Sequence, residues 1–211
     1  MSRSVKPRHE RSQVSQLRWT GIFIAVGILS ACARGGPLQR EWTEDVKLDG
    51  GSAVEVRRSV TLKVSNSLSG DAYNAEELGA TLSFSGSLSQ LPAWSAPRMA
   101  LVLYRDVTTQ EWVIVATTTS CEVWQREGKP KPAYWEYRLK PQGWQEVPLS
   151  SASIGRRANL FFGYDHRLKS AHVTAADTER VDHDPTNGSK YRKISGDPDM
   201  YICGEGNPGK R

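Results

Sequence analysis

The fold of this chain is decided by the stretch Val46-Lys47-Leu48-Asp49-Gly50-Gly51-Ser52-Ala53-Val54-Glu55-Val56. Apolar and polar residues alternate on both sides of a glycine-rich centre. Successive side chains of a β-strand point to opposite faces of a sheet, so this alternation is typical of half-buried strands. The stretch therefore predicts two antiparallel strands joined by a tight turn over residues 49–52.

The same period of two continues through most of the chain. Val60, Leu62 and Val64 form a further apolar set, and we interpret Arg57-Arg58 as a break in phase before it, as at a bulge or turn. The continuously apolar run 99–104 favours a central strand. Further strands are expected at 80–85, 112–116, 121–124, 134–139, 144–149 and 159–164. Seven to nine short strands punctuated by Gly and Pro predict an all-β fold, an antiparallel sandwich or barrel.

Helical signals are weak in this sequence. Asn74–Glu77 can cap one short turn, and Ser170–Val181 can hold a short helix. From His166 to Asn187 the chain is polar without a sustained period, which indicates either a long surface excursion or a partly disordered loop. The tail from Gly196 to Arg211 is rich in Gly and Pro.

The N-terminus has the composition of a secretory signal. Met1–Thr20 carries five basic residues against one acidic residue, and the apolar run Gly21–Leu29 follows. Such a run fits a signal core of roughly 7–15 residues and is too short for a bilayer span of about 20 residues. With Leu29-Ser30-Ala31-Cys32 after it, this segment resembles the signal and lipobox of bacterial prolipoproteins. An ordinary cleaved signal and an uncleaved anchor are the alternatives.

The resemblance implies a specific address for the protein. Cleavage would leave Cys32 as the N-terminus, with a diacylglyceryl group on its sulfur and usually an acyl group such as palmitate on its amine. Two or three acyl chains make attachment effectively permanent. Ala33 follows the cysteine where Asp would imply inner-membrane retention, so the resemblance implies the periplasmic face of the outer membrane, or the inner membrane if sorting differs.

The resulting division of the chain has four parts. They are a signal peptide (1–31), a lipidated N-terminus with a linker (32–41), a β-sandwich domain (42–164), and a polar excursion with a tail (165–211). The run Trp42–Gly50 also resembles the first hairpin of small uncharacterised proteobacterial lipoprotein domains, and this likeness implies no chemistry.

Removing the signal changes the interpretation of charge. The whole chain carries +5, but residues 1–31 account for +4 of it, so the remainder carries +1. The basic character therefore gives no indication of a nucleic-acid partner.

Three cysteines are present, and lipidation of Cys32 would leave Cys121 and Cys203. In an oxidising compartment these two are expected to form a disulfide that ties the tail to the domain. Two separate thiols are the alternative, since the sequence cannot show whether their α-carbons approach closely enough.

Candidate catalytic and metal-binding groups are sparse. His166, His172 and His183 lie in the polar excursion near several aspartates, but without a helical spacing that would bring two histidines together. No serine lies in a Gly-x-Ser-x-Gly motif. We therefore expect no enzyme, no metal and no cofactor other than the covalent lipid.

The aromatic residues between 94 and 144 give the remaining hypothesis. Strand alternation would turn some of them outward, where rings stack on sugars or anchor a protein; the alternative is that they fill the core. The possible ligand-facing residues are Trp94, Trp124, Tyr134, Trp135 and Trp144. Three functions follow: a structural or protein-interaction module of the envelope, a module that binds peptidoglycan or polysaccharide, and, less favoured, a metal-dependent hydrolase using the three histidines.

Overall fold

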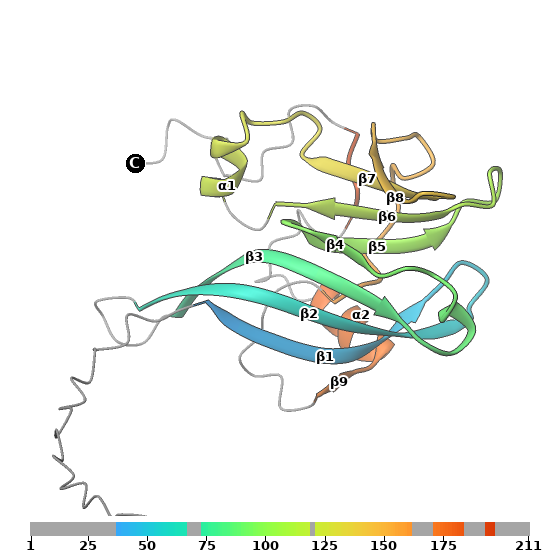
Figure 1. The fold of residues 1–211 in the computed structure, drawn as a ribbon, viewed down its shortest axis with the longest axis horizontal. Coiled ribbons are helices and arrows are strands. Elements are labelled where there is room, and N and C mark those ends of the chain that lie inside the picture. Colours follow the sequence, from blue (N-terminus) through green and yellow to red (C-terminus); the bar gives the residue numbers. More distant parts are fainter. Residues whose placement is uncertain (1–36, 67–72, 119–120, 162–170, 184–192, 197–211) are drawn as a thin grey trace, which may run out of the picture. The chain divides into compact units, whose positions relative to one another are not determined.

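Two β-sheets are stacked in layers in the computed structural model of this chain (Figure 1). The structure describes residues 37–66, 73–118, 121–161, 171–183 and 193–196. The first sheet has the order β4-β3-β2-β1-β9, formed by Trp94–Ala96, Tyr73–Phe84, Ala53–Asn66, Leu38–Lys47 and His172–Val173. The second has the order β5-β6-β7-β8, formed by Met99–Arg105, Trp112–Thr117, Tyr134–Lys140 and Gly143–Val147. All pairs are antiparallel except β1 with β9, and neither sheet closes on itself, so the expected all-β class is confirmed as a sandwich.

The hairpin predicted around the glycines is present. β1 and β2 pair antiparallel, with Val46 opposite Val54. Gly50 and Gly51 have φ of 90° and 85°, which residues with a side chain rarely adopt. Strand β1 begins at Leu38, so it includes residues 38–41, which the sequence assigned to the linker.

Strand β2 runs without a break through Arg57-Arg58, and the predicted interruption is wrong. Val56, Arg58, Val60 and Leu62 are all buried, while Arg57 between them is exposed. The period of two therefore continues unbroken, and Arg58 occupies a position in the core that an apolar residue would normally fill.

The irregularity lies instead between Thr61 and Leu62 in their pairing with β3. Thr61 is opposite Gly79 and Leu62 is opposite Glu77, so Leu78 is the extra residue of a β-bulge. The bulge reverses the phase of β3: Leu78 is 39% exposed and Glu77 is 9% exposed. Residues 74–77, where a helical turn was expected, belong to this strand.

Strand β5 is buried on both faces, which explains its continuous apolar sequence. It is an edge strand of its sheet rather than a central one, and residues 159 and 160 cover its free edge through hydrogen bonds to Leu101 O. The Asn159 side chain accepts from Leu103 N (2.9 Å) and donates to Leu103 O (2.8 Å). Residues 159–161 are well packed but form no strand, which corrects that part of the 159–164 prediction; residues 162–164 lie outside the described part.

Two clusters of apolar side chains hold the layers together. The first fills the space between the sheets and includes Val56, Leu82, Ile114 and Leu160. The second covers the outer face of β5 and β6. Its members are Met99, Leu101, Val102, Tyr104, Val113, Val115, Tyr134, Ala158 and Ile194. Ile194 belongs to the 165–211 part of the chain, which was expected to form a polar excursion with a tail, so packing ties this residue to the sandwich.

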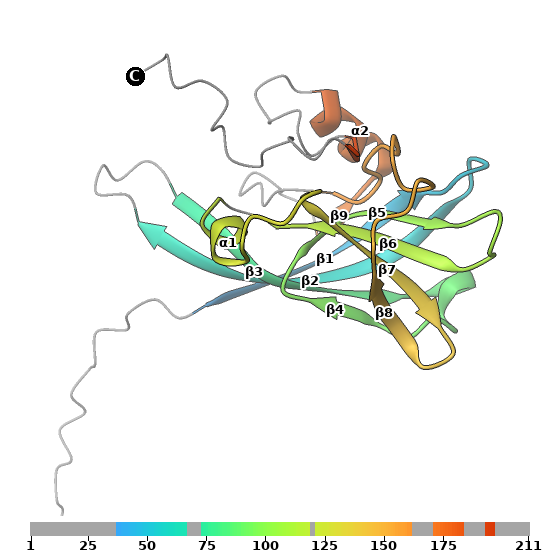
Figure 2. The same cartoon turned by 90° about the horizontal axis from the view of Figure 1, so that it is seen from above.

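The helices differ from the expectation at residues 121–126 as well as at 74–77. Residues 121–126 form the short helix α1 (Cys121–Arg126), not the predicted strand. Helix α2 (Ala175–His183) lies within and just beyond the expected 170–181 segment, to one side of the two sheets (Figure 2). A reciprocal cap begins it, with Asp177 N donating to Thr174 Oγ1 (3.2 Å) and Thr174 N to Asp177 Oδ2 (3.1 Å). Among the described residues, no helix is long and apolar enough to cross a membrane.

The inner cluster can be tested by truncating one side chain. Leu82 is fully buried between the sheets. Leu82→Ala should lower the free energy of unfolding by about 2–5 kcal/mol, because it removes apolar contacts and leaves a cavity. Thr81→Ala, on the outward side of the same strand, should change it by about 0.5 kcal/mol or less. Denaturant unfolding measures both, and equal effects would contradict the assigned strand phase.

Candidate functional site

Three of the five possible ligand-facing aromatics are buried in this structure, which bears out the alternative that they fill the core. Trp94, Trp124 and Tyr134 are 1%, 0% and 5% exposed, so no ligand can reach their faces. Trp94 packs edge-on against Tyr137 with ring centroids 5.3 Å apart, and the Trp124 indole N–H donates to Pro130 O (3.1 Å). These three rings fill the interior, and the prediction that they face a ligand is wrong.

The other two tryptophans are partly covered. The Arg98 guanidinium lies 3.9 Å from the centroid of the Trp135 ring. The Trp144 indole donates to Pro92 O (2.8 Å), and the ring packs on Phe84 at 6.1 Å. Both rings are therefore engaged by the protein itself.

His172 is the only one of the three predicted histidines whose side chain is described. Its Nδ1 lies 2.7 Å from Thr43 Oγ1, and its Nε2 lies 3.3 Å from Asp45 Oδ2. A hydroxyl, an imidazole and a carboxylate are thus aligned, as in nucleophilic catalysis. These residues line neither of the two clefts given below, and their contacts hold β9 to β1.

The remaining predicted site residues cannot be placed. Cys32, Cys203 and His166 lie outside the described residues. Cys121 and His183 begin α1 and end α2, and their side chains are also outside them. The lipid attachment and the Cys121–Cys203 disulfide therefore stay predictions. Within the described part, no three His, Cys, Asp or Glu side chains are placed to hold a metal ion.

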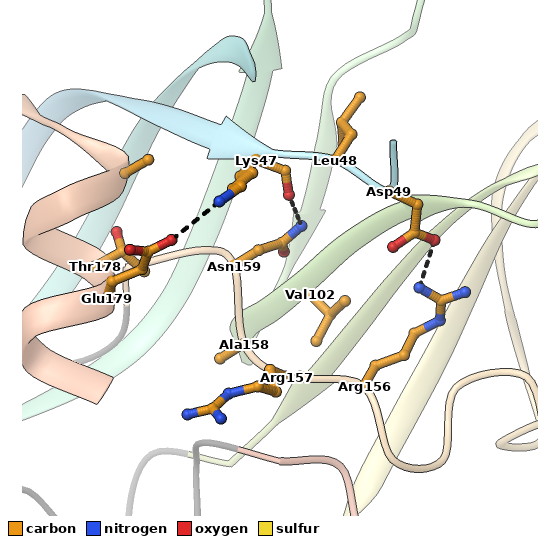
Figure 3. A pocket seen from close by; sticks show the side chains of 11 residues that line it. Lys47, Leu48, Asp49, Val102, Arg156, Arg157, Ala158, Asn159, Thr178 and Glu179 are labelled. Carbon is orange, nitrogen blue, oxygen red and sulfur yellow. Dashed lines mark hydrogen bonds and ion pairs between the residues drawn. The ribbon is translucent and has the colours of Figure 1, made fainter. Parts of the chain in front are cut away.

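One end of the sandwich carries two clefts, which share the turn between β1 and β2. We call this region the loop end, defined by the β1–β2 turn (residues 48–52) and the β5–β6 turn (residues 106–111). The first cleft has a volume of about 540 Å³ and lies between the end of β1, the segment 156–159 and α2 (Figure 3). Its charged side chains are paired: Lys47 with Glu179 at 3.4 Å, and Arg156 with Asp49 at 2.7 Å.

The second cleft, of about 550 Å³, lies on the other side of the same turn. Its lining combines apolar side chains such as Val54, Leu88 and Trp112 with polar groups of the β5–β6 turn. At the tip of that turn the Val107 side chain is 77% exposed.

The carboxylate of Asp106 holds the β5–β6 turn in place through hydrogen bonds. Asp106 Oδ1 accepts from Thr108 N (2.9 Å), and its Oδ2 accepts from Arg138 (2.9 Å). The hydrogen bond from Thr108, together with those from Arg138 and Thr109, lowers the pKa of Asp106 even though partial burial opposes this. Val107 therefore lies on a turn whose backbone is held by hydrogen bonds to Asp106.

A buried ionic cluster lies between the sheets, formed by Glu44 on β1, Arg58 on β2 and Glu77 on β3. These side chains are 0%, 1% and 9% exposed. Arg58 donates to Glu77 Oε1 (3.3 Å), and its Nη1 lies 3.9 Å from Glu44 Oε1. The guanidinium also lies 5.6 Å from the centroid of the Trp42 ring.

Arg58 also connects the first sheet to the rest of the molecule. It donates to Ala100 O on β5 (3.2 Å) and to Phe161 O (2.6 Å). Glu44 Oε2 accepts from Phe161 N (2.6 Å), so both backbone groups of Phe161 are bonded to the cluster. One guanidinium thus joins two sheets and the segment that covers the edge of β5.

The charges in this cluster do not balance when all groups are ionised. Burial raises the pKa of Glu44 from its ordinary value of 4.5 to about 7; Arg58 and the Phe161 amide lower it, and Glu77 raises it further. Burial also raises the pKa of Glu77, and Arg58 opposes that rise through its charge and its hydrogen bond. The cluster is too enclosed to act on a substrate, but it can bind and release a proton.

No family model, no curated protein and no solved structure matches this chain. The assignment of its function therefore rests on its own residues.

Sequence reasoning missed both the ionic cluster and the clefts. A signal for the cluster was present in the alternation of β2. Every second residue from 54 to 62 faces the same side of the strand; four of these are apolar (Val54, Val56, Val60 and Leu62), and the fifth is Arg58. No comparable signal marks Glu77, whose inward direction depends on the bulge at Leu78. The clefts depend on how α2 and residues 156–159 pack, which no local pattern specifies.

Neighbouring arginines on β2 provide a matched test of the cluster. Arg58→Ala should lower the free energy of unfolding by about 3–5 kcal/mol, because it leaves two buried carboxyl groups without their cation. Arg57→Ala should cost about 1 kcal/mol or less, since Arg57 is exposed and only pairs with Glu41 on the surface. Equal losses in denaturant unfolding would contradict the burial of Arg58.

Proposed function

We propose that this chain is a lipid-anchored protein of the bacterial cell envelope, whose β-sandwich binds a protein partner through the loop end. The observation that carries the proposal is the meeting of two clefts, of about 540 and 550 Å³, at the single turn 48–52. Loops held by a rigid sandwich are a common location for binding residues.

The lining of the clefts suits a protein surface. Apolar groups such as Leu88, Trp112 and Val107 lie beside charged and amide groups, and protein interfaces combine apolar anchors with a polar rim in this way. Binding of glycans through the five predicted aromatics has lost its support, because three of the rings are buried and the other two are partly covered.

The proposed anchor would leave the loop end accessible. From Cys32 to Leu38 the chain can reach at most about 20 Å. The anchor therefore joins the sandwich at the start of β1, whereas the 48–52 turn follows the other end of this ten-residue strand, about 30 Å away.

Photo-crosslinking tests the partner-binding surface. A photoreactive phenylalanine analogue replacing Val107, in the full chain expressed in its own envelope, should give a discrete protein adduct on illumination. The matched control replaces Gln125, an exposed residue of α1 at the opposite end of the second sheet (Figure 1). No adduct from position 107, or the same adducts from position 125, would contradict the proposal.

Intact mass of the membrane-extracted protein tests the anchor and the disulfide. We expect a chain that starts at Cys32 with added acyl mass, and two thiols that can be alkylated only after reduction. Cys32→Ser should abolish both processing and membrane attachment. A full-length chain without lipid and with three free thiols would contradict the proposed location.

A further inference from the structure

Within the part of the chain that the structure describes, the buried cluster holds two carboxyl groups, those of Glu44 and Glu77, and one cation, Arg58. Among the described residues, the charged groups that act on Glu44 are Arg58 from β2 and Glu77 from β3. Ala100 on strand β5 and Phe161 contribute backbone groups to the cluster. With both carboxyls ionised, these three side chains together would carry one net negative charge, which is costly away from water.

One bound proton removes this imbalance, and the geometry indicates which carboxyl takes it. Glu77 accepts a direct hydrogen bond from Arg58 at 3.3 Å. Glu44 Oε1 lies farther from the guanidinium, at 3.9 Å, and has no hydrogen-bond partner among the described residues. Arg58 and Glu77 therefore form the ion pair, and Glu44 holds the proton on an oxygen that no donor occupies.

We propose that Glu44 is a proton-binding site that makes the docking of residues 159–161 dependent on pH. We call these three residues the strap. When Glu44 binds a proton the cluster is neutral and the strap stays closed over the edge of β5; when Glu44 loses it, the excess charge favours opening of the strap and entry of water.

The strap is the element that this change acts on, because its contacts depend on the cluster. Phe161 N donates to Glu44 Oε2 and Phe161 O accepts from Arg58, each at 2.6 Å. Leu160 N donates to Leu101 O at 3.0 Å, at the open edge of β5. Asn159 also lines the first cleft, so opening of the strap changes the shape of that cleft.

The direction of the pH effect follows from the pKa of Glu44. In the closed form the pKa is about 7, and in a hydrated form it returns to about 4.5. A carboxyl group whose pKa is raised in the closed form stabilises that form fully below the hydrated pKa of about 4.5. This stabilisation is lost as the pH rises through about 7, the pKa of the closed form. The strap is therefore held most firmly in mild acid and least firmly above neutrality.

Residue-resolved hydrogen exchange of the Leu160 and Phe161 amides measures this opening. After correction for intrinsic exchange rates, we expect protection to fall by about thirtyfold between pH 5.5 and pH 8.5, as linkage requires for these two pKa values. Glu44→Gln keeps the oxygen that accepts from Phe161 N but cannot ionise. Its protection should stay within about twofold over the same range.

Two further variants separate proton binding from a merely structural role. Glu41→Gln changes an exposed carboxylate of the same strand and should retain the full pH dependence. In Glu77→Gln, Glu44 is the one carboxylate of the cluster left to pair with Arg58. This lowers the pKa of Glu44 and should move the pH dependence below pH 5.5. The proposal is overturned if the wild-type amides show less than a twofold change, or if Glu44→Gln retains the dependence.

Discussion

A single buried guanidinium, that of Arg58, is the constraint on which the rest of the sandwich depends. It occupies an inward position of β2 between apolar residues, where a charge can persist only with partners close by. The partners come from separate parts of the chain: Glu77 on β3, the carbonyl of Ala100 on β5, and the carbonyl of Phe161 on the strap. Correct placement of this one side chain requires that the two sheets and the strap assemble together.

Other features of the fold serve this arrangement. The bulge at Leu78 turns Glu77 inward, because without the extra residue Glu77 would face solvent. The strap that meets the guanidinium also covers the open edge of β5, and an unprotected edge is a site of unwanted pairing. Buried ion pairs are poor sources of net stability, because desolvation offsets much of their attraction. A cluster with one carboxyl in excess fits the binding of a proton better than it fits simple reinforcement of the core.

The sequence predicted those parts of the molecule that depend on local pattern. The hairpin around Gly50-Gly51 and the all-β class follow from alternation and turn residues, and a short helix was expected within residues 170–181. Predictions failed where long-range packing overrides the local pattern. Charged Arg58 was interpreted as a break in the strand. Trp94 and Trp124 were named as possible ligand-facing residues although they are core residues, and Cys121–Trp124 is helical despite its alternation. The clefts of the loop end arise from segments distant in sequence and had no local signature.

The central claim, that Glu44, Arg58 and Glu77 share the dry interior, is tested most directly by a carbon-13 NMR titration of the glutamate carboxyl groups. The account predicts a resonance that titrates near pH 7 and is absent from Glu44→Gln, well separated from those of exposed glutamates near 4.5. If every glutamate titrated near its ordinary value, Glu44 would be hydrated, and the buried cluster with everything derived from it would be contradicted.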